Sequence, residues 1–177
     1  YNGNLLQITN TPSSIINWQN FSTGASEVPR FIQQSASRTV LHRRAGGQPS
    51  VILGALQSQL ANGAIGGRVF LIDPSGVVFG AGAQVNTGGL VVSTLGLSDA
   101  DFLGGRNRFT EVQGAGNIVN QGKISTPTGG SIYLIAPNVT NSGIIRSDAG
   151  DILLPEGKNE ELVNENSTAS GVTITAH

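Results

Sequence analysis

The sequence contains no cysteine and no methionine, and it carries little charge and few aromatic residues. Without cysteine, disulfide bonds and thiolate metal sites are excluded. Charged residues make up 12% of the chain and the net charge is −1, so no overall field attracts nucleic acid or anionic lipid, and we expect no nucleic-acid partner. Because methionine is absent, we expect that Tyr1 is not the natural start and that the chain is a fragment.

Glycine is abundant where charge is scarce, at 25 of 177 residues, which is about 14% against a usual ~7%. Many small polar residues with few charges favour tight turns and stacked strands over amphipathic helices. The hydrophobic content of 38% is too high for a disordered chain, and 177 residues suffice for one domain with a real core. No apolar run approaches the ~20 residues of a membrane-spanning helix.

Short apolar segments rich in β-forming residues predict strands along most of the chain. Such segments are Leu5–Thr9, Ile15–Phe21, Phe31–Leu41 and Val172–Thr175. Pro49–Leu60 is the one predicted helix, because its apolar residues fall near helical spacing and Ser50 could cap it. We expect Tyr1–Phe21 to form an N-terminal cap with the first strands, and the acidic tail after Pro155 to form a loop.

Three short motifs recur at an interval of 20 or 21 residues, which is typical of a solenoid. The recurring pairs are Asn120–Ile124 with Asn141–Ile145, Gly130–Leu134 with Gly150–Leu154, and Gly67–Leu71 with Gly88–Val92. Helical solenoids need repeats of ~33 residues or more, and the leucine-rich-repeat frame is absent. A parallel β-helix, whose stacked coils bury a continuous core, is the favoured fold. A β-sandwich of short strands remains the alternative on this pattern alone.

One turn stands out between the apolar runs Val69–Ile72 and Val77–Phe79, and its residues are Asp73, Pro74, Ser75 and Gly76. Aspartate suits the first position of a type I turn, because its carboxylate can accept a backbone N–H. Proline presets φ at the second position, serine is tolerated at the third, and glycine suits the fourth. The segment therefore predicts strand, turn and strand.

Chemistry-bearing residues are few and poorly grouped. His42 stands beside Arg43 and Arg44, and we interpret this cluster as a solvated strand face rather than a polyanion or metal site. The carboxylate pairs Asp99 with Asp101 and Asp148 with Asp151 lack basic partners at a coil offset, and we interpret them as solvated loop residues or as a cap for the backbone near Leu103. We expect no catalytic residue, no metal and no cofactor, and hence no enzyme.

Several segments, taken in order, carry a resemblance that covers essentially the whole chain. The segments are Ile15–Phe21, Ile52–Leu56, Val69–Ala83, Gly89–Leu95, Ser98–Leu103 with Phe109, and Gly130–Asn138. Together they resemble the secretion domain of two-partner secretion exoproteins (TpsA), the filamentous-haemagglutinin N-terminal family. The resemblance implies an all-β fold, a right-handed parallel β-helix with ~20-residue coils, an N-terminal cap and extra-helical β elements. It implies that residues 1–177 form a single TPS domain of a larger exoprotein.

The chain departs from the family signature, which is Asn-Pro-Asn-Gly, at Asp73 and Ser75. Both replacements are short side chains that form local hydrogen bonds, so we expect the turn to survive and Asp73→Asn to be tolerated. We also expect these two departures to change the surface that a partner would touch. The family's second motif, Asn-Pro-Xaa-Leu, has no clear counterpart here.

The resemblance also implies a function. The domain would address an adhesin- or haemolysin-type exoprotein to an outer-membrane TpsB transporter of the Omp85 type with POTRA domains, and nucleate β-helix folding at the cell surface. The protein would transit the periplasm as a monomer and be secreted, and its parent would contact any host or bacterial receptor. The motif turn, Asp73–Gly76, is the expected secretion motif, and strand addition could involve Ile15, Asn17, Trp18 and Phe21. A β-helical carbohydrate-active enzyme and a glycan-binding adhesin passenger remain the alternatives.

Overall fold

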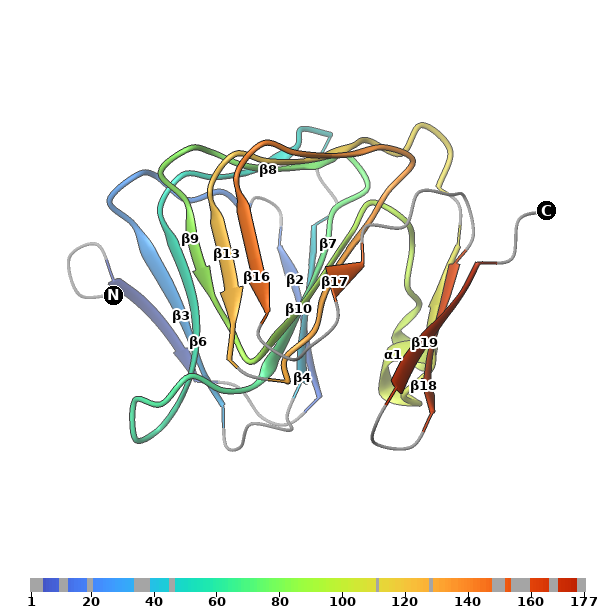
Figure 1. Ribbon diagram of the computed structural model, residues 1–177, viewed down its shortest axis with the longest axis horizontal. Helices are drawn as coiled ribbons and strands as arrows, with labels where there is room; N and C mark the ends of the chain where they lie inside the picture. Colours follow the sequence, from blue (N-terminus) through green and yellow to red (C-terminus); the bar gives the residue numbers. More distant parts are fainter. Residues whose placement is uncertain are drawn as a thin grey trace.

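Parallel sheets account for most of the computed structural model, in which the chain winds repeatedly from one sheet to the next (Figure 1). The residues that the structure describes are 5–9, 13–18, 21–33, 39–44, 47–110, 112–127, 129–147, 152–153, 160–165 and 169–174. The side chains of Trp18, Asn107 and Leu153 and those of residues 160–174 are outside this description. Asp148, Asp151 and His177 also lie outside the described residues.

Three parallel sheets form the faces of the winding chain, here called faces A, B and C. Face A contains β1 (Leu5–Thr9), β3 (Val28–Gln33), β6 (Ala55–Leu60), β9 (Gln84–Asn86), β13 (Lys123–Thr126) and β16 (Ile144–Ser147). Face B contains β2 (Ser14–Trp18), β4 (Thr39–Arg44), β7 (Arg68–Ile72), β10 (Gly89–Ser93), β14 (Ile132–Ile135) and β17 (Ile152–Leu153). Face C contains β5 (Ser50–Ile52), β8 (Val77–Phe79), β12 (Ile118–Asn120) and β15 (Val139–Asn141).

Successive strands visit the faces in the order A, B, C, so each circuit is one coil of a parallel β-helix. The repeats in the sequence mark the register between coils. Asn120 pairs with Asn141, Ile132 with Ile152, and Val69 with Leu90. These are the same offsets of 20 and 21 residues, so the solenoid prediction is confirmed and the β-sandwich is excluded.

Alternation along each strand sends every second side chain into the interior of the coils. The inward residues stack into one continuous apolar core that includes Phe31, Leu56, Val85 and Ile124 from face A, Val69, Leu90 and Ile132 from face B, and Ile52, Phe79 and Ile118 from face C. All ten have at most 1% of their surface exposed. At ~25 cal/mol per Å² of buried apolar surface, this core supplies the main driving force for stacking.

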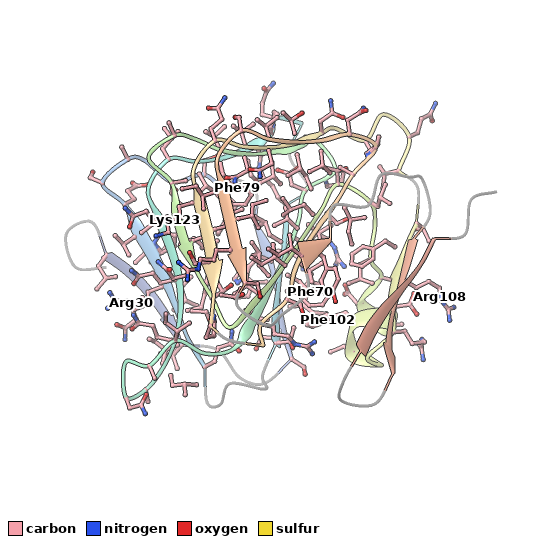
Figure 2. All side chains as sticks on the ribbon, viewed as in Figure 1. Arg30, Phe70, Phe79, Phe102, Arg108 and Lys123 are labelled. Atoms are coloured by element: carbon pink, nitrogen blue, oxygen red, sulfur yellow. The ribbon has the colours of Figure 1, made fainter. Side chains whose placement is uncertain are left out.

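Face B is buried on both sides, because an insertion between β10 and β12 covers its outer surface. The insertion includes α1 (Asp99–Leu103) and β11 (Asn107–Phe109). Phe102 of α1 meets Phe70 of β7 edge to face, with ring centroids 5.5 Å apart (Figure 2). This second core explains why the strands of face B read as unbroken apolar runs rather than alternating ones.

Polar contacts secure the insertion to the coils. The Ser98 hydroxyl caps α1 by accepting the Asp101 N–H at 3.1 Å. Arg43, on the outer side of face B, donates to the Asp99 carboxylate and to the Leu97 carbonyl. Arg43 of β4 therefore fixes the position of the start of α1.

The extra-helical β elements lie beside α1 (Figure 1). β11 pairs antiparallel with β18 (Glu160–Glu165), which pairs antiparallel with β19 (Ala169–Ile174). The expected loop after Pro155 is therefore wrong where β18 forms, because β11 offers it a partner edge. The expected last strand is confirmed as far as Ile174, and the remainder lies outside the described residues.

The N-terminal segment begins the coil stack. β1 pairs in parallel with β3, and β2 pairs in parallel with β4. The predicted first strands are confirmed at Leu5–Thr9 and Ser14–Trp18. The rest of the expected cap, residues 1–4, 10–12 and 19–20, lies outside the described residues.

The predicted helix at Pro49–Leu60 is wrong, because this segment forms β5 and β6 with a corner at Gly54. A Cβ at Gly54 would lie 2.4 Å from the Glu27 carbonyl oxygen of the preceding coil. Only glycine allows that approach, and the Ala55 N–H then donates to the same oxygen at 3.2 Å. Pairing between coils overrides the helical spacing of the leucines.

The interpretation of His42 as a solvated residue is also wrong. His42 points into the coils, is fully buried, and lies with its ring 4.1 Å from that of Phe31 and 5.7 Å from that of Phe21. The alternation of β4 explains this, since Val40, His42 and Arg44 share the inner side while Arg43 faces outward. Burial lowers the pKa of His42 from 6.5 to about 3.

This buried imidazole predicts a pH-dependent stability. Between about pH 6.5 and pH 3 the unfolded chain binds a proton at His42 that the folded chain does not, so stability falls as the pH falls. We expect the His42 contribution to lower the free energy of unfolding by about 1.4 kcal/mol between pH 7.5 and pH 5.5. Urea unfolding of wild type and His42→Leu at both pH values measures it. An unchanged pH dependence in His42→Leu would contradict the assignment.

Candidate functional site

The motif turn connects β7 of face B to β8 of face C and has the local geometry that its sequence predicts. The Gly76 N–H donates to the Asp73 carbonyl at 3.1 Å, which closes the turn. The Ser75 N–H donates to Asp73 Oδ1 at 3.0 Å, as expected for aspartate at the first position. Gly76 has a φ of +121°, a conformation that side-chain-bearing residues rarely adopt.

The motif turn is enclosed by the coils on both sides. On one side the Gly76 carbonyl accepts the Ser50 N–H at 3.0 Å. On the other side Gly116 donates its N–H to the Pro74 carbonyl at 2.8 Å, and the Asn117 carbonyl accepts the Val77 N–H at 3.1 Å. A Cβ on Gly116 would lie 2.2 Å from the Ser75 carbonyl oxygen, so the neighbouring coil passes directly over the turn.

The side chain of Asp73 is fully buried, which corrects the expectation that this residue changes the surface a partner would touch. Its Oδ2 accepts a hydrogen bond from the Ser50 hydroxyl at 2.6 Å and an ion-pair contact from Arg44 at 3.2 Å. Only Pro74 and Ser75 of the turn are partly exposed. The expectation that Asp73→Asn is tolerated is revised too, because the change would remove the carboxylate that pairs with the buried Arg44.

Sequence reasoning missed Arg44 and Ser50 as partners of the motif turn. The pattern that could have found them is the alternation along β4, which places Arg44 on the same inner side as the buried Val40. Ser50 gave no comparable sign, because its position one coil away from Asp73 follows only from the register between β5 and β8.

The segment expected to contact a transporter lies at an edge of the coil stack. β2 is an edge strand of face B, and among the described strands it pairs only with β4. Asn17 is exposed and Ile15 is half-buried against the second core. Trp18 ends the strand, and Phe21 is only 6% exposed against His42.

The interpretation of Asp99 and Asp101 as loop residues is wrong, because both lie in α1, where each carboxylate has a structural contact. Asp99 pairs with Arg43, and Asp101 pairs with Arg106 at 2.9 Å. The Arg106 hydrogen bond lowers the pKa of the Asp101 carboxyl. Each carboxylate is thus paired with an arginine rather than with the other as a general acid and base.

The chain is thus a parallel β-helix in which the motif turn is a corner enclosed by neighbouring coils. The sequence model of the TPS secretion domain family matches residues 2–177, so the chain belongs to that family. The family is one of secretion domains rather than of enzymes. Proteins that carry a TPS domain are secreted exoproteins, and the domain acts with a TpsB transporter.

Two curated relatives are heme/hemopexin-binding proteins of Haemophilus influenzae. The first is 30% identical over 167 residues, which cover 90% of this chain and 18% of the relative. The second is 32% identical over 79 residues, which cover 45% of this chain and 8% of that relative. The chain thus spans less than a fifth of the length of either relative.

A solved structure supports the same assignment. The crystal structure of the HMW1 secretion domain from Haemophilus influenzae matches with a TM-score of 0.87 and 30% sequence identity. The match covers 99% of this chain and 45% of the HMW1 chain. Within the described part of the present chain, no helix is both long and apolar enough to cross a membrane.

The geometry at Gly76 predicts a large effect of adding a single methyl group. A Cβ there would lie 3.0 Å from the Asn117 carbonyl oxygen in addition to the strained φ, whereas Gly63, at φ +85°, has open space around it. We expect Gly63→Ala to lower the free energy of unfolding by about 1–2 kcal/mol from backbone strain alone. We expect Gly76→Ala to lower it by clearly more, measured by denaturant unfolding of both variants. Equal losses would show that the motif turn is not confined by the next coil.

Proposed function

We propose that this domain addresses its parent exoprotein to an outer-membrane transporter of the Omp85 type, recognised through the transporter's periplasmic POTRA domains. The chain crosses the membrane unfolded as a monomer, folds at the cell surface, and provides the template on which later coils assemble. Any adhesin or haemolysin activity, and any receptor contact, would belong to the parent protein outside this domain.

The single observation that carries this proposal is the enclosure of the motif turn within the coil stack. Backbone hydrogen bonds join it to Ser50 on one side and to Gly116 and Asn117 on the other. A turn held in this way is suited to setting the path of three successive coils. We infer that the motif supports secretion through the fold that it permits, rather than as a protruding docking epitope.

The last coil supports the template role. Ile152 of β17 is in register with Ile132 of β14, whose side chain is fully buried in the core. Ile152 itself is 40% exposed, although it occupies the same inward row. A further coil stacked on β17 would bury this surface, and growth by adjacent coils avoids the entropy of closing long loops.

The first coil supports recognition by strand addition. Among the described strands, β1 and β2 lie at the ends of faces A and B, and each pairs with a strand on one side. Strand addition to such an edge uses main-chain hydrogen bonds and reads alternate side chains. Within β2 the exposed Asn17 is suited to this contact, whereas Phe21 would be accessible only before the domain folds.

A carbohydrate-active enzyme is not favoured, because Asp99 and Asp101 are held by Arg43 and Arg106. A glycan-binding passenger is not favoured either, because the family to which the chain belongs is a family of secretion domains.

An export assay separates a structural role of the motif turn from an epitope role. Co-expression with the cognate TpsB transporter should give strongly reduced secretion of Gly76→Val, because the β-branched residue meets both the strained φ and the Asn117 carbonyl. Ser75→Ala changes a partly exposed side chain while keeping the backbone contacts, and it should be secreted almost normally. Loss of secretion for Ser75→Ala with normal secretion of Gly76→Val would reverse the conclusion.

Photo-crosslinking tests the edge-strand contact. A crosslinking amino acid at Asn17 should capture the transporter during export, since this residue is exposed on β2. The same probe at Gln113, which is exposed on the insertion, is the matched control and should give little product. Equal capture at the two positions would argue against recognition through β2.

A further inference from the structure

An ion pair is buried inside the coils at the motif turn. Arg44 at the end of β4 lies 3.2 Å from Asp73 Oδ2, and the two side chains are 7% and 0% exposed. The same carboxylate accepts hydrogen bonds from the Ser50 hydroxyl at 2.6 Å and the Ser75 N–H at 3.0 Å. Both oxygens of the Asp73 carboxylate thus accept hydrogen bonds, and Oδ2 also pairs with the Arg44 charge.

The pair joins neighbouring coils at equivalent positions. Arg43 is in register with Ile72, so the residues that follow them, Arg44 and Asp73, are neighbours across the same row of face B. Ser50 begins β5, in the coil of Arg44, and its backbone N–H also bonds to the Gly76 carbonyl. The carboxylate therefore holds one coil against the corner of the next.

Replacing one residue of the pair should destabilise the domain much more than replacing both. Removing one member of a buried ion pair leaves an uncompensated charge in a low-dielectric interior, which is far more destabilising than removing both members. The neutral, nearly isosteric replacement of Asp73 by asparagine would remove the carboxylate that pairs with the Arg44 guanidinium. The replacement of Arg44 by glutamine would leave the buried Asp73 carboxylate with its hydrogen bonds from Ser50 and Ser75 but without the Arg44 charge.

We propose that Arg44 is a positioning residue for the motif turn, acting through Asp73, and that the two residues must be matched in charge for the turn to form. The turn then does not require aspartate as such. It requires that the charge of its first residue match the charge of the residue at position 44 in β4. The consequence for secretion rests on the proposed function of the domain, whereas the pairing itself does not.

A double-mutant cycle on the purified domain tests the pairing, using Arg44→Gln, Asp73→Asn and the double variant. We expect each single change to lower the folding equilibrium constant roughly a hundredfold or more. The double variant should recover at least tenfold over the worse single variant, and Arg44→Lys, which keeps the charge, should lose less than Arg44→Gln. Additive losses, or a double variant as unstable as the singles, would overturn the proposal.

The exposed pair Arg106 and Asp101 provides the matched control, because its side chains are 52% and 20% exposed. The corresponding cycle with Arg106→Gln and Asp101→Asn should show only a few-fold coupling, as for solvent-screened pairs. Coupling as large as that of the buried pair would show that burial is not the cause. If a single variant at the buried pair fails to fold, a folded double variant is itself the expected rescue.

Export of the wild type, Arg44→Gln, Asp73→Asn and the double variant through the transporter extends the test. We expect the double variant to be secreted better than Arg44→Gln, following the order of stability. Thermodynamic coupling without any effect on secretion would leave the pairing intact and contradict the role of the motif turn in the proposed function. Absence of thermodynamic coupling would contradict the pairing whatever the secretion result.

Discussion

Backbone hydrogen bonding between successive coils is the constraint on which this structure depends. Every strand of faces A, B and C pairs in parallel with strands of the adjacent coils, so each corner must follow a path that keeps the next strand in register. At Gly54 that path leaves no room for a side chain, and at Gly76 it combines a φ of +121° with a tight approach to the next coil. The motif turn is one such corner. Its carboxylate and its carbonyls therefore bond to groups of the coil stack, and its glycine lies against the next coil.

The insertion converts an ordinary coil stack into a domain with two cores. The inner core follows the stacked inward residues, and the outer core forms where α1 and β11 cover face B. Because side chains alternate along β4, the neighbouring residues Arg43 and Arg44 lie on opposite sides of face B. Arg43 points outward and holds the insertion, whereas Arg44 points inward and balances the charge of Asp73.

Much of the architecture was predictable because it is periodic. The recurrence of Asn120 as Asn141 and of Ile132 as Ile152 corresponds directly to the pairing of neighbouring coils. The turn chemistry of Asp73 and Gly76 is equally local, since it depends on one carboxylate and one backbone angle. Predictions failed where a partner distant in sequence decides the outcome, as for the strands at Pro49–Leu60 and for β18.

By itself the sequence favoured a β-solenoid and predicted a tight turn between two apolar strands, because repeat length, alternation and turn chemistry are local properties. Only the tertiary structure decided that His42, Arg44 and Asp73 lie inside the coils, since burial depends on the register between strands about 29 residues apart. The same register decides that the motif turn is an internal corner. Under the proposed function, the turn contributes to secretion as part of the folded stack and not as four residues read in isolation.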